Sequence, residues 1–297
     1  MNCIKERMLE SIIMPKRAER KPWEMFFIGL IYASASILIV SFIFAKDSVL
    51  SNYGGIFMLL FIVLCTLPFM YYLIKFEEEK DVSISNEGKL IKEHSKALWA
   101  LMFLFAGILV AMAVWYLILP QYTSVNFNAQ IKVFCAINSP ANFDYCIERQ
   151  GLSPVTGGIT LTRRLVEIFA NNIYVLIFTL IFSLALGAGT IFILAWNASV
   201  IAAAMGIFFK DNFQAGINII GFFLAFFRYM LHGGLEIASY FIAALAGGII
   251  SVAIIRRDLR GERLWKILQD SLILVIIAIV ILIVAALLEV FVTPALF

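Results

Sequence analysis

Long apolar runs separated by short polar stretches dominate the pattern of the chain. A helix that crosses a bilayer needs about 20 mainly apolar residues. Six runs meet this criterion: residues 23–45, 54–74, 97–119 and 173–196, a run that ends at Ile255, and residues 267–292. The pattern therefore predicts an all-α, polytopic integral membrane helix bundle with about six full transmembrane helices.

Basic residues in the short connections predict the orientation of these helices, because cytoplasmic connections carry an excess of Lys and Arg. Six basic residues precede the first run, five lysines follow the second, and five more basic residues lie in residues 256–266. We expect these three regions to be cytoplasmic. The N-terminus is then cytoplasmic and the C-terminus extracytoplasmic, in the cell membrane.

The orientation places a constraint on residues 197–232. The fourth run and the run that ends at Ile255 are both expected to end in the cytoplasm, so residues 197–232 must cross the membrane an odd number of times. Residues 198–209 are apolar but too short for an ordinary crossing. We therefore expect one or two short or re-entrant helices in addition to the six full ones.

One polar stretch, residues 228–240, interrupts a long apolar region. Its polar positions lie four residues apart, at Arg228, His232, Glu236 and Tyr240. On a continuous helix these side chains share one face. Ionisable residues in a membrane helix cost about 2.5–3.5 kcal/mol each on insertion scales and are candidates for a functional site. Gly233 and Gly234 favour a helix break, so one helix and two half-helices both stay open.

Two asparagines at the ends of the fourth run extend this polar group. Asn172 lies at its start and Asn197 directly after its end. An Asn at a helix start is commonly a cap, and the alternative is that Asn172 contacts the polar residues of the 228–240 stretch. We include both in a predicted intramembrane polar core. Glu289, near the outer end of the last run, is expected to reach water.

Composition supports a membrane protein and argues against nucleic acid as a partner. The chain is 62% hydrophobic, with a mean hydropathy of +0.95, whereas soluble domains are about 45–50% apolar. The net charge is only +3, and the basic residues cluster between the apolar runs. The lipid bilayer is therefore the first expected partner, and no nucleic-acid surface is indicated.

Cys135 and Cys146 lie in one predicted outer loop, with ten residues between them. An extracytoplasmic compartment permits a disulfide, which would contribute on the order of 3 kcal/mol by closing so small a loop. We predict that the two cysteines are bonded. The alternative is two unpaired thiols.

Glycine usage divides the chain into parts. Glycine and alanine are concentrated between Gly187 and Gly248, and small residues let membrane helices approach closely. We expect residues 1–119 to form a basic segment with a three-helix accessory module, residues 120–164 an outer loop, and residues 165–297 the tightly packed core. Residues 77–96 mix charges of both signs and are expected to form a solvated connector or a docking surface.

The polar stretch does not contain a complete catalytic set. His232 and Glu236 have a spacing that can hold a metal, but a catalytic metal needs a third protein ligand, and His94, the other histidine, lies in the connector. We expect no cofactor. Three interpretations stay open: structural pairing that fixes the register of the bundle, a transporter or channel site at a broken helix, and, least favoured, an intramembrane metal-dependent enzyme.

Several motifs in a fixed order resemble the stage II sporulation protein M family. They are FANN at 169–172, LGAG at 186–189, WNA at 196–198, LHGGLEIA at 231–238 and AG at 246–247. The resemblance covers roughly residues 165–260. Met230 and Ala198 stand where the family pattern has Pro and Gly, which favours a divergent, archaeal member.

The resemblance implies a polytopic membrane component of an envelope-associated complex. In spore formers the family's namesake belongs to a complex that remodels the cell wall during engulfment, and partner proteins supply the enzymatic activity. By analogy we expect a non-enzymatic scaffold or anchor that binds protein partners or forms a homo-oligomer.

Overall fold

The computed structural model describes residues 15–47, 49–84, 86–138, 146, 161–184, 188–212, 219–255 and 262–296. These residues form helices and the turns between them, with no strand among them. Six helices are long and apolar enough to cross a membrane: 23–44, 50–80, 88–118, 190–210, 220–254 and 264–296. A shorter apolar helix covers Ile168–Ser183. The predicted all-α, polytopic membrane bundle is confirmed.

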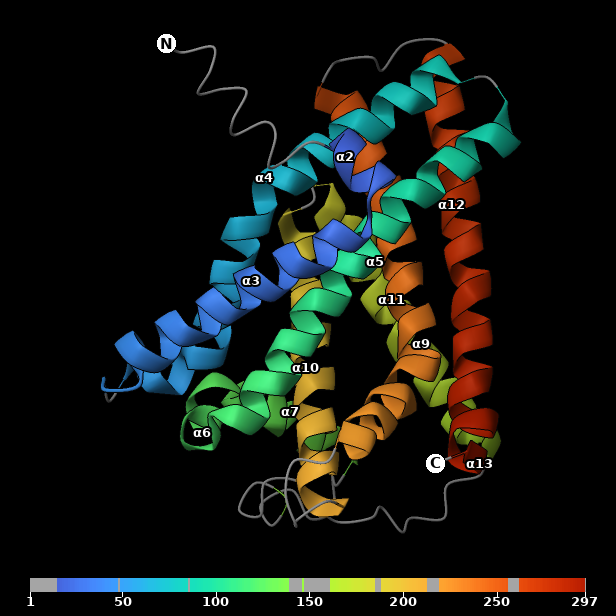
Figure 1. Ribbon diagram of the computed structural model, residues 1–297. Helices are drawn as coiled ribbons and strands as arrows, with labels where there is room; N and C mark the ends of the chain where they lie inside the picture. The colour runs from blue at the N-terminus through green and yellow to red at the C-terminus, as the bar shows by residue number, and fades with distance from the viewer. Residues whose placement is uncertain are drawn as a thin grey trace, which may run out of the picture.

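The N-terminal part of the chain forms three long helices and several short elements. These are α2 (Pro15–Arg20), α3 (Trp23–Ile39) with its π-helical extension η1 (Val40–Phe44), η2 (Leu50–Tyr53), α4 (Gly54–Ser83) and α5 (Glu87–Ile118). Helix α3 crosses α5 obliquely (Figure 1). A Cβ atom on Gly29 would overlap the carbonyl oxygen of Leu104, and one on Gly107 that of Phe26. Only glycine permits this close crossing.

The two ends of the bundle differ. The junction of α4 and α5 lies at the same end as α2, which we call the α2 end (Figure 1). The opposite α7 end carries η3 (Pro120–Tyr122), α6 (Thr123–Asn126) and α7 (Asn128–Asn138). There Cys135 and Cys146 form the predicted disulfide, with their Cα atoms 5.7 Å apart. Residues 139–145 and 147–160 of the expected outer loop lie outside the described residues.

The C-terminal part of the chain forms four long helices. These are α9 (Leu161–Ser183), α10 (Ala188–Asn212), α11 (Ile219–Ile255) and α12 (Glu262–Leu287), followed by the π-helical turn η5 (Leu288–Val292) and α13 (Thr293–Leu296). Helices α9 and α11 are parallel, because Asn172 bonds to Glu236 near their middles and Ser251 to the Leu184 carbonyl near their ends. Helix α12 runs antiparallel to α11.

The prediction that residues 173–196 form one membrane-spanning helix is wrong. Helix α9 ends at Ser183 and α10 begins at Ala188. Residues 184–187 are apolar or small in the sequence, so the hydropathy pattern shows no interruption. Ser251 of α11 donates a hydrogen bond to the Leu184 carbonyl at 2.5 Å, which satisfies one carbonyl at the end of α9. The apolar residues 198–209 are the second half of α10, so they form no re-entrant helix.

Close contacts join the expected accessory module to the expected core. A Cβ atom on Gly206 of α10 would overlap the Tyr116 ring of α5, and one on Gly248 of α11 would lie 2.9 Å from Ile74 of α4. The division at residue 119 stays a prediction. Small residues nevertheless bring helices from both sides of that boundary into direct contact.

Candidate functional site

Helix α11 carries Arg228, His232, Glu236 and Tyr240 on one continuous helix. The helix break predicted at Gly233 and Gly234 is wrong, because α11 extends unbroken through both glycines and only bends (Figure 1). Breaking a helix in hydrocarbon leaves backbone groups unsatisfied at several kcal/mol each, whereas glycine costs only about 1 kcal/mol inside a helix. The larger cost favours continuity.

Three polar side chains join α9 to α11. Asn172 donates a hydrogen bond from Nδ2 to Oε1 of Glu236 at 2.5 Å. The Tyr240 hydroxyl donates to Oδ1 of the same asparagine at 3.1 Å. Tyr240 is 1% exposed and Asn172 7%. One asparagine side chain therefore satisfies a carboxylate and a phenol from two successive turns of α11.

The last turns of the chain complete this group. His232 contacts the Thr293 hydroxyl through Nδ1 at 3.1 Å. The carboxyl groups of Glu236 and Glu289 are close enough to interact electrostatically. Glu289 lies in the π-helical turn η5, and single π turns are frequent at functional sites. We call Asn172, His232, Glu236, Tyr240, Glu289 and Thr293 the α11 cluster.

Arg228 and Asn197, two predicted members, lie apart from these hydrogen bonds. The Arg228 guanidinium stacks over the Phe208 ring at 5.1 Å and interacts electrostatically with His232. Asn197 donates to the Ile193 carbonyl of its own helix at 2.8 Å. Arg228 is thus a neighbour of the α11 cluster, whereas the hydrogen bond of Asn197 stays within α10.

The α11 cluster keeps two polar atoms available. Glu236 and His232 are partly exposed. Among the described residues, Oε2 of Glu236 and Nε2 of His232 have no hydrogen-bond partner. Thr293 lies close to the C-terminal end of the last helix, and α13 lies at the α7 end (Figure 1). The cluster can therefore bind a proton, a polar ligand or a partner's side chain near that end.

A second polar cluster lies at the α2 end. Lys80 of α4 donates to Glu19 of α2 at 2.6 Å and to Glu77 at 2.7 Å. Glu77 also contacts Nδ1 of His94, on α5, at 2.7 Å. Their side chains are 7% (Glu19), 0% (Glu77), 9% (Lys80) and 5% (His94) exposed. We call these four residues the α2 clasp.

The α2 clasp corrects the expectation of a solvated connector. Residues 77–96 form the end of α4 and the start of α5, and several of their charges are buried within the bundle. Lys266 of α12 donates to the Ile84 carbonyl at 2.5 Å, so α12 holds the turn between the two helices. The mixed charges of residues 77–96 led to the expectation of a solvated connector. Their partners lie on other elements, far away in the sequence, so the local pattern does not show that these charges are paired.

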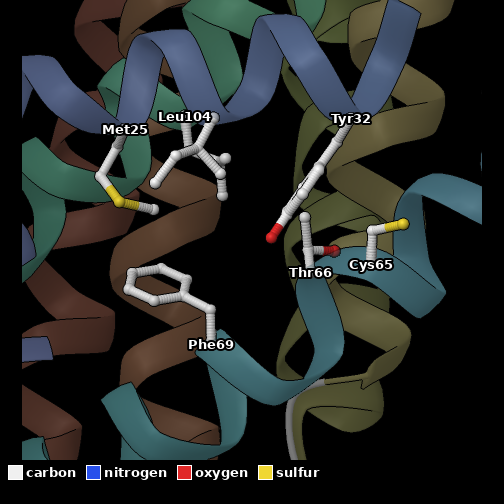
Figure 2. Close-up of a pocket in the computed structure, with 7 residues that line it drawn as sticks. Met25, Tyr32, Cys65, Thr66, Phe69 and Leu104 are labelled. Carbon is white, nitrogen blue, oxygen red and sulfur yellow. The ribbon is translucent and has the colours of Figure 1, made fainter. Parts of the chain in front are cut away.

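Two cavities lie outside the α11 cluster. Figure 2 shows the first, a small cavity of about 10 Å³ that is partly open to the surroundings and lined by Met25, Ile28, Tyr32, Cys65, Thr66, Phe69 and Leu104. In this view the Cys65 sulfur points away from the cavity. The second, also about 10 Å³, is lined by Leu90, Ile91, His94, Asp270, Ile273 and Leu274. It lies beside the α2 clasp.

The described residues contain no group of three or more His, Cys, Asp or Glu side chains placed to hold a metal ion. Sequence reasoning missed Thr293 and the role of Glu289 in the α11 cluster. Glu289 carried a usable signal, because it is an acidic residue in an apolar run. Thr293 carried none, since a threonine near the end of a helix has no distinctive pattern.

A family model described as Stage II sporulation protein M matches residues 95–294. The match covers more than half of the chain and includes the whole α11 cluster. The match begins before and ends after residues 165–260, the range of the resemblance noted in the sequence. It therefore also includes most of α5 and all of α7 and α12. No curated protein and no solved structure matches the chain.

Proposed function

The chain belongs to the stage II sporulation protein M family, and from that premise we propose that it is a non-enzymatic scaffold that anchors partner proteins of an envelope-associated complex. The supporting observation is that the polar side chains of the α11 cluster hydrogen-bond one helix to another. Asn172, Glu236 and Tyr240 form hydrogen bonds between α9 and α11. Such bonds fix the arrangement of membrane helices.

We place the α2 end in the cytoplasm and the α7 end outside, in the cytoplasmic membrane. Basic residues before α3 and between α4 and α5 support this orientation. The disulfide at the α7 end supports it as well, because disulfides persist in oxidising compartments. The test is labelling of Gln121→Cys and Lys92→Cys, two exposed positions, with a membrane-impermeant thiol reagent in intact cells. Only Gln121→Cys should react.

Crosslinking of the tagged full chain in its native membrane tests the scaffold. We expect a discrete complex that contains other proteins or further copies of the chain. Asn172→Leu should reduce the yield of that complex, because α9 and α11 lose their shared hydrogen bonds. Asn197→Leu is the matched control, since the Asn197 amide bonds only within its own helix. Recovery of the single chain alone would contradict the proposal.

A transporter or channel is the second candidate. The observations that favour it are the nearby carboxyl groups of Glu236 and Glu289 and the available, partly exposed atoms of Glu236 and His232. These groups could hold a cation or a proton on its way across the membrane. Substrate-dependent or proton flux in proteoliposomes that is lost in Glu236→Gln would favour transport over the scaffold. Equal ion leak in the wild type and the variant would count against it.

A further inference from the structure

The α2 clasp connects three elements that are distant in the sequence. Glu19 lies 61 residues before Lys80, and Glu77 lies 17 residues before His94. The contact of Lys80 with Glu19 links α2 to α4, and the ion pair of Arg17 with Glu24 links α2 to α3. Lys80 also lies 4.6 Å above the Phe76 ring, and Lys16 of α2 lies 5.4 Å from the same ring. The position of α2 therefore depends on the ionic state of a few buried groups.

The charges in the clasp do not balance without a proton. Glu19 and Glu77 are two carboxyl groups, and Lys80 supplies one positive charge. The His94 imidazole supplies a second only when it is protonated. A buried charge without compensation is strongly unfavourable. The docked arrangement therefore requires one proton, on a carboxyl group or on the imidazole.

Other charged groups of the neighbouring elements have their own contacts. Arg17 of α2 pairs with Glu24 of α3 at 2.7 Å, and Lys96 pairs with the Glu93 carboxylate of α5 at 2.6 Å. Lys16 lies over the Phe76 ring beside Lys80, Glu93 interacts electrostatically with Lys80, and Asp270 of α12 lines a cavity together with His94. Glu78 and Asp270 are buried acidic groups with contacts of their own.

We propose that the α2 clasp is a proton-operated latch, which holds α2 against α4 and α5 when it carries its proton and releases α2 when the pH on that side of the membrane rises. The observation that carries this inference is the burial of two carboxyl groups, Glu19 of α2 and Glu77 of α4, against the single ammonium group of Lys80. All four clasp residues precede residue 95. The latch therefore lies outside the family match and is independent of the proposed scaffold function.

The direction of the pH dependence follows from Glu19. Burial raises the pKa of its carboxyl group from 4.5 to about 7, and its hydrogen bond with Glu77 acts in the same direction, whereas Lys80 lowers it. The pKa of Glu19 is higher in the docked state than in the released state. Docking is therefore fully favoured at pH values below the ordinary carboxyl pKa of 4.5, and this contribution is lost as the pH rises through about 7. Above that pH the ratio of docked to released α2 falls about tenfold per pH unit.

Distance measurements between α2 and α5 test the latch. Spin labels at Arg20→Cys and Lys92→Cys, both at exposed positions, are introduced into the full chain in lipid nanodiscs. Cys3 and Cys65 are replaced by Ser, and the disulfide is kept. Pulsed electron paramagnetic resonance at pH values from 5.5 to 8.5, set as experimental conditions around a pKa of about 7, should show one short distance in acid and a broad, longer population in alkali.

Three variants separate the latch from a general change in the protein. Glu19→Gln is neutral at every pH and should keep α2 docked throughout. Lys80→Met removes the link and should release α2 throughout. Glu24→Gln is the matched control, because it weakens the ion pair that joins Arg17 of α2 to α3 and leaves the clasp residues unchanged; its transition should occur at the same pH as that of the wild type. An unchanged wild-type distance over the pH range, or a wild-type transition in Glu19→Gln, would overturn the proposal.

Discussion

The α11 cluster and the α2 clasp solve the same physical problem in different ways. Both remove ionisable groups from water within a helical bundle, where each group needs a partner. The α11 cluster relies mainly on neutral donors, the Asn172 amide and the Tyr240 hydroxyl. The α2 clasp relies on ion pairs, with Lys80 between two carboxyl groups. The clasp should therefore be more sensitive to removal of a single charge.

The two clusters also differ in their relation to the family. The family match includes every residue of the α11 cluster and none of the α2 clasp. The α11 cluster thus lies in the part of the chain that matches the family, whereas the clasp lies in the N-terminal part before it. Disrupting each cluster should therefore have separable effects, which the following variants examine.

Lys80→Met should have the largest effect on stability. It leaves Glu19 and Glu77 buried without the ammonium group, and breaking a buried ion pair in this way costs about 3–5 kcal/mol. The control is Lys96→Met, which removes a half-exposed pair with Glu93 and should cost less than about 1 kcal/mol. Unfolding free energies in nanodiscs measure both. Equal losses would show that the clasp behaves like a surface ion pair.

Asn172→Leu should have the second largest effect. Leucine has a similar size but leaves the Glu236 carboxylate without its donor and the Tyr240 hydroxyl without its acceptor. Unsatisfied buried groups cost about 1–3 kcal/mol, so we expect a loss of about 2 kcal/mol in the unfolding free energy. Asn197→Leu, measured under the same conditions, should change it by less than about 1 kcal/mol. A loss in Asn197→Leu as large as in Asn172→Leu would contradict the comparison.

Tyr240→Phe isolates one neutral hydrogen bond of the α11 cluster. It removes only the hydroxyl that donates to Asn172. Hydrogen bonds between membrane helices contribute about 0.6 kcal/mol on average and up to about 2 kcal/mol, so we expect a loss of about 1 kcal/mol. Thermal unfolding of the purified chain measures it. A loss above about 3 kcal/mol would place Tyr240 in the same energetic class as Lys80.

Gly234→Ala should have the smallest effect, and it tests the continuity of α11. A Cβ atom at this position would lie 3.5 Å from Met230 Cε, an ordinary contact. Alanine favours a helix over glycine, so the unfolding free energy should stay equal or rise by about 0.5 kcal/mol. Gly247→Ala is the contrast, because its Cβ would lie 2.7 Å from the Leu180 carbonyl oxygen and should destabilise the protein. A destabilised Gly234→Ala would indicate a helix break after all.

Sequence alone identified most of the α11 cluster. Ionisable residues in an apolar run are conspicuous, and a spacing of four residues places them on one helix face. Glu289 is also an ionisable residue in an apolar run, but a spacing rule within one helix does not place it against α11. The prediction failed at Gly233 and Gly234, where the local preference of glycine is weaker than the requirement for backbone hydrogen bonds in hydrocarbon.

The turn after α9 and the α2 clasp could not be predicted from local sequence. The turn is apolar, and a side chain 67 residues later satisfies the end of the helix. In the sequence the clasp residues resemble solvated charges, because the partner of Lys80 on α2, Glu19, lies 61 residues away and no local pattern pairs them. Both features depend on contacts between distant segments, which hydropathy and periodicity do not contain.

A double-mutant cycle between Asn172→Leu and Glu236→Met tests most directly whether the α11 cluster joins α9 to α11. Both replacements preserve size and remove the hydrogen-bonding groups. The unfolding free energies of the wild type, the two single variants and the double variant should give a coupling of about 1 kcal/mol or more between the two positions. Losses that add to within about 0.3 kcal/mol would contradict a direct bond between these helices.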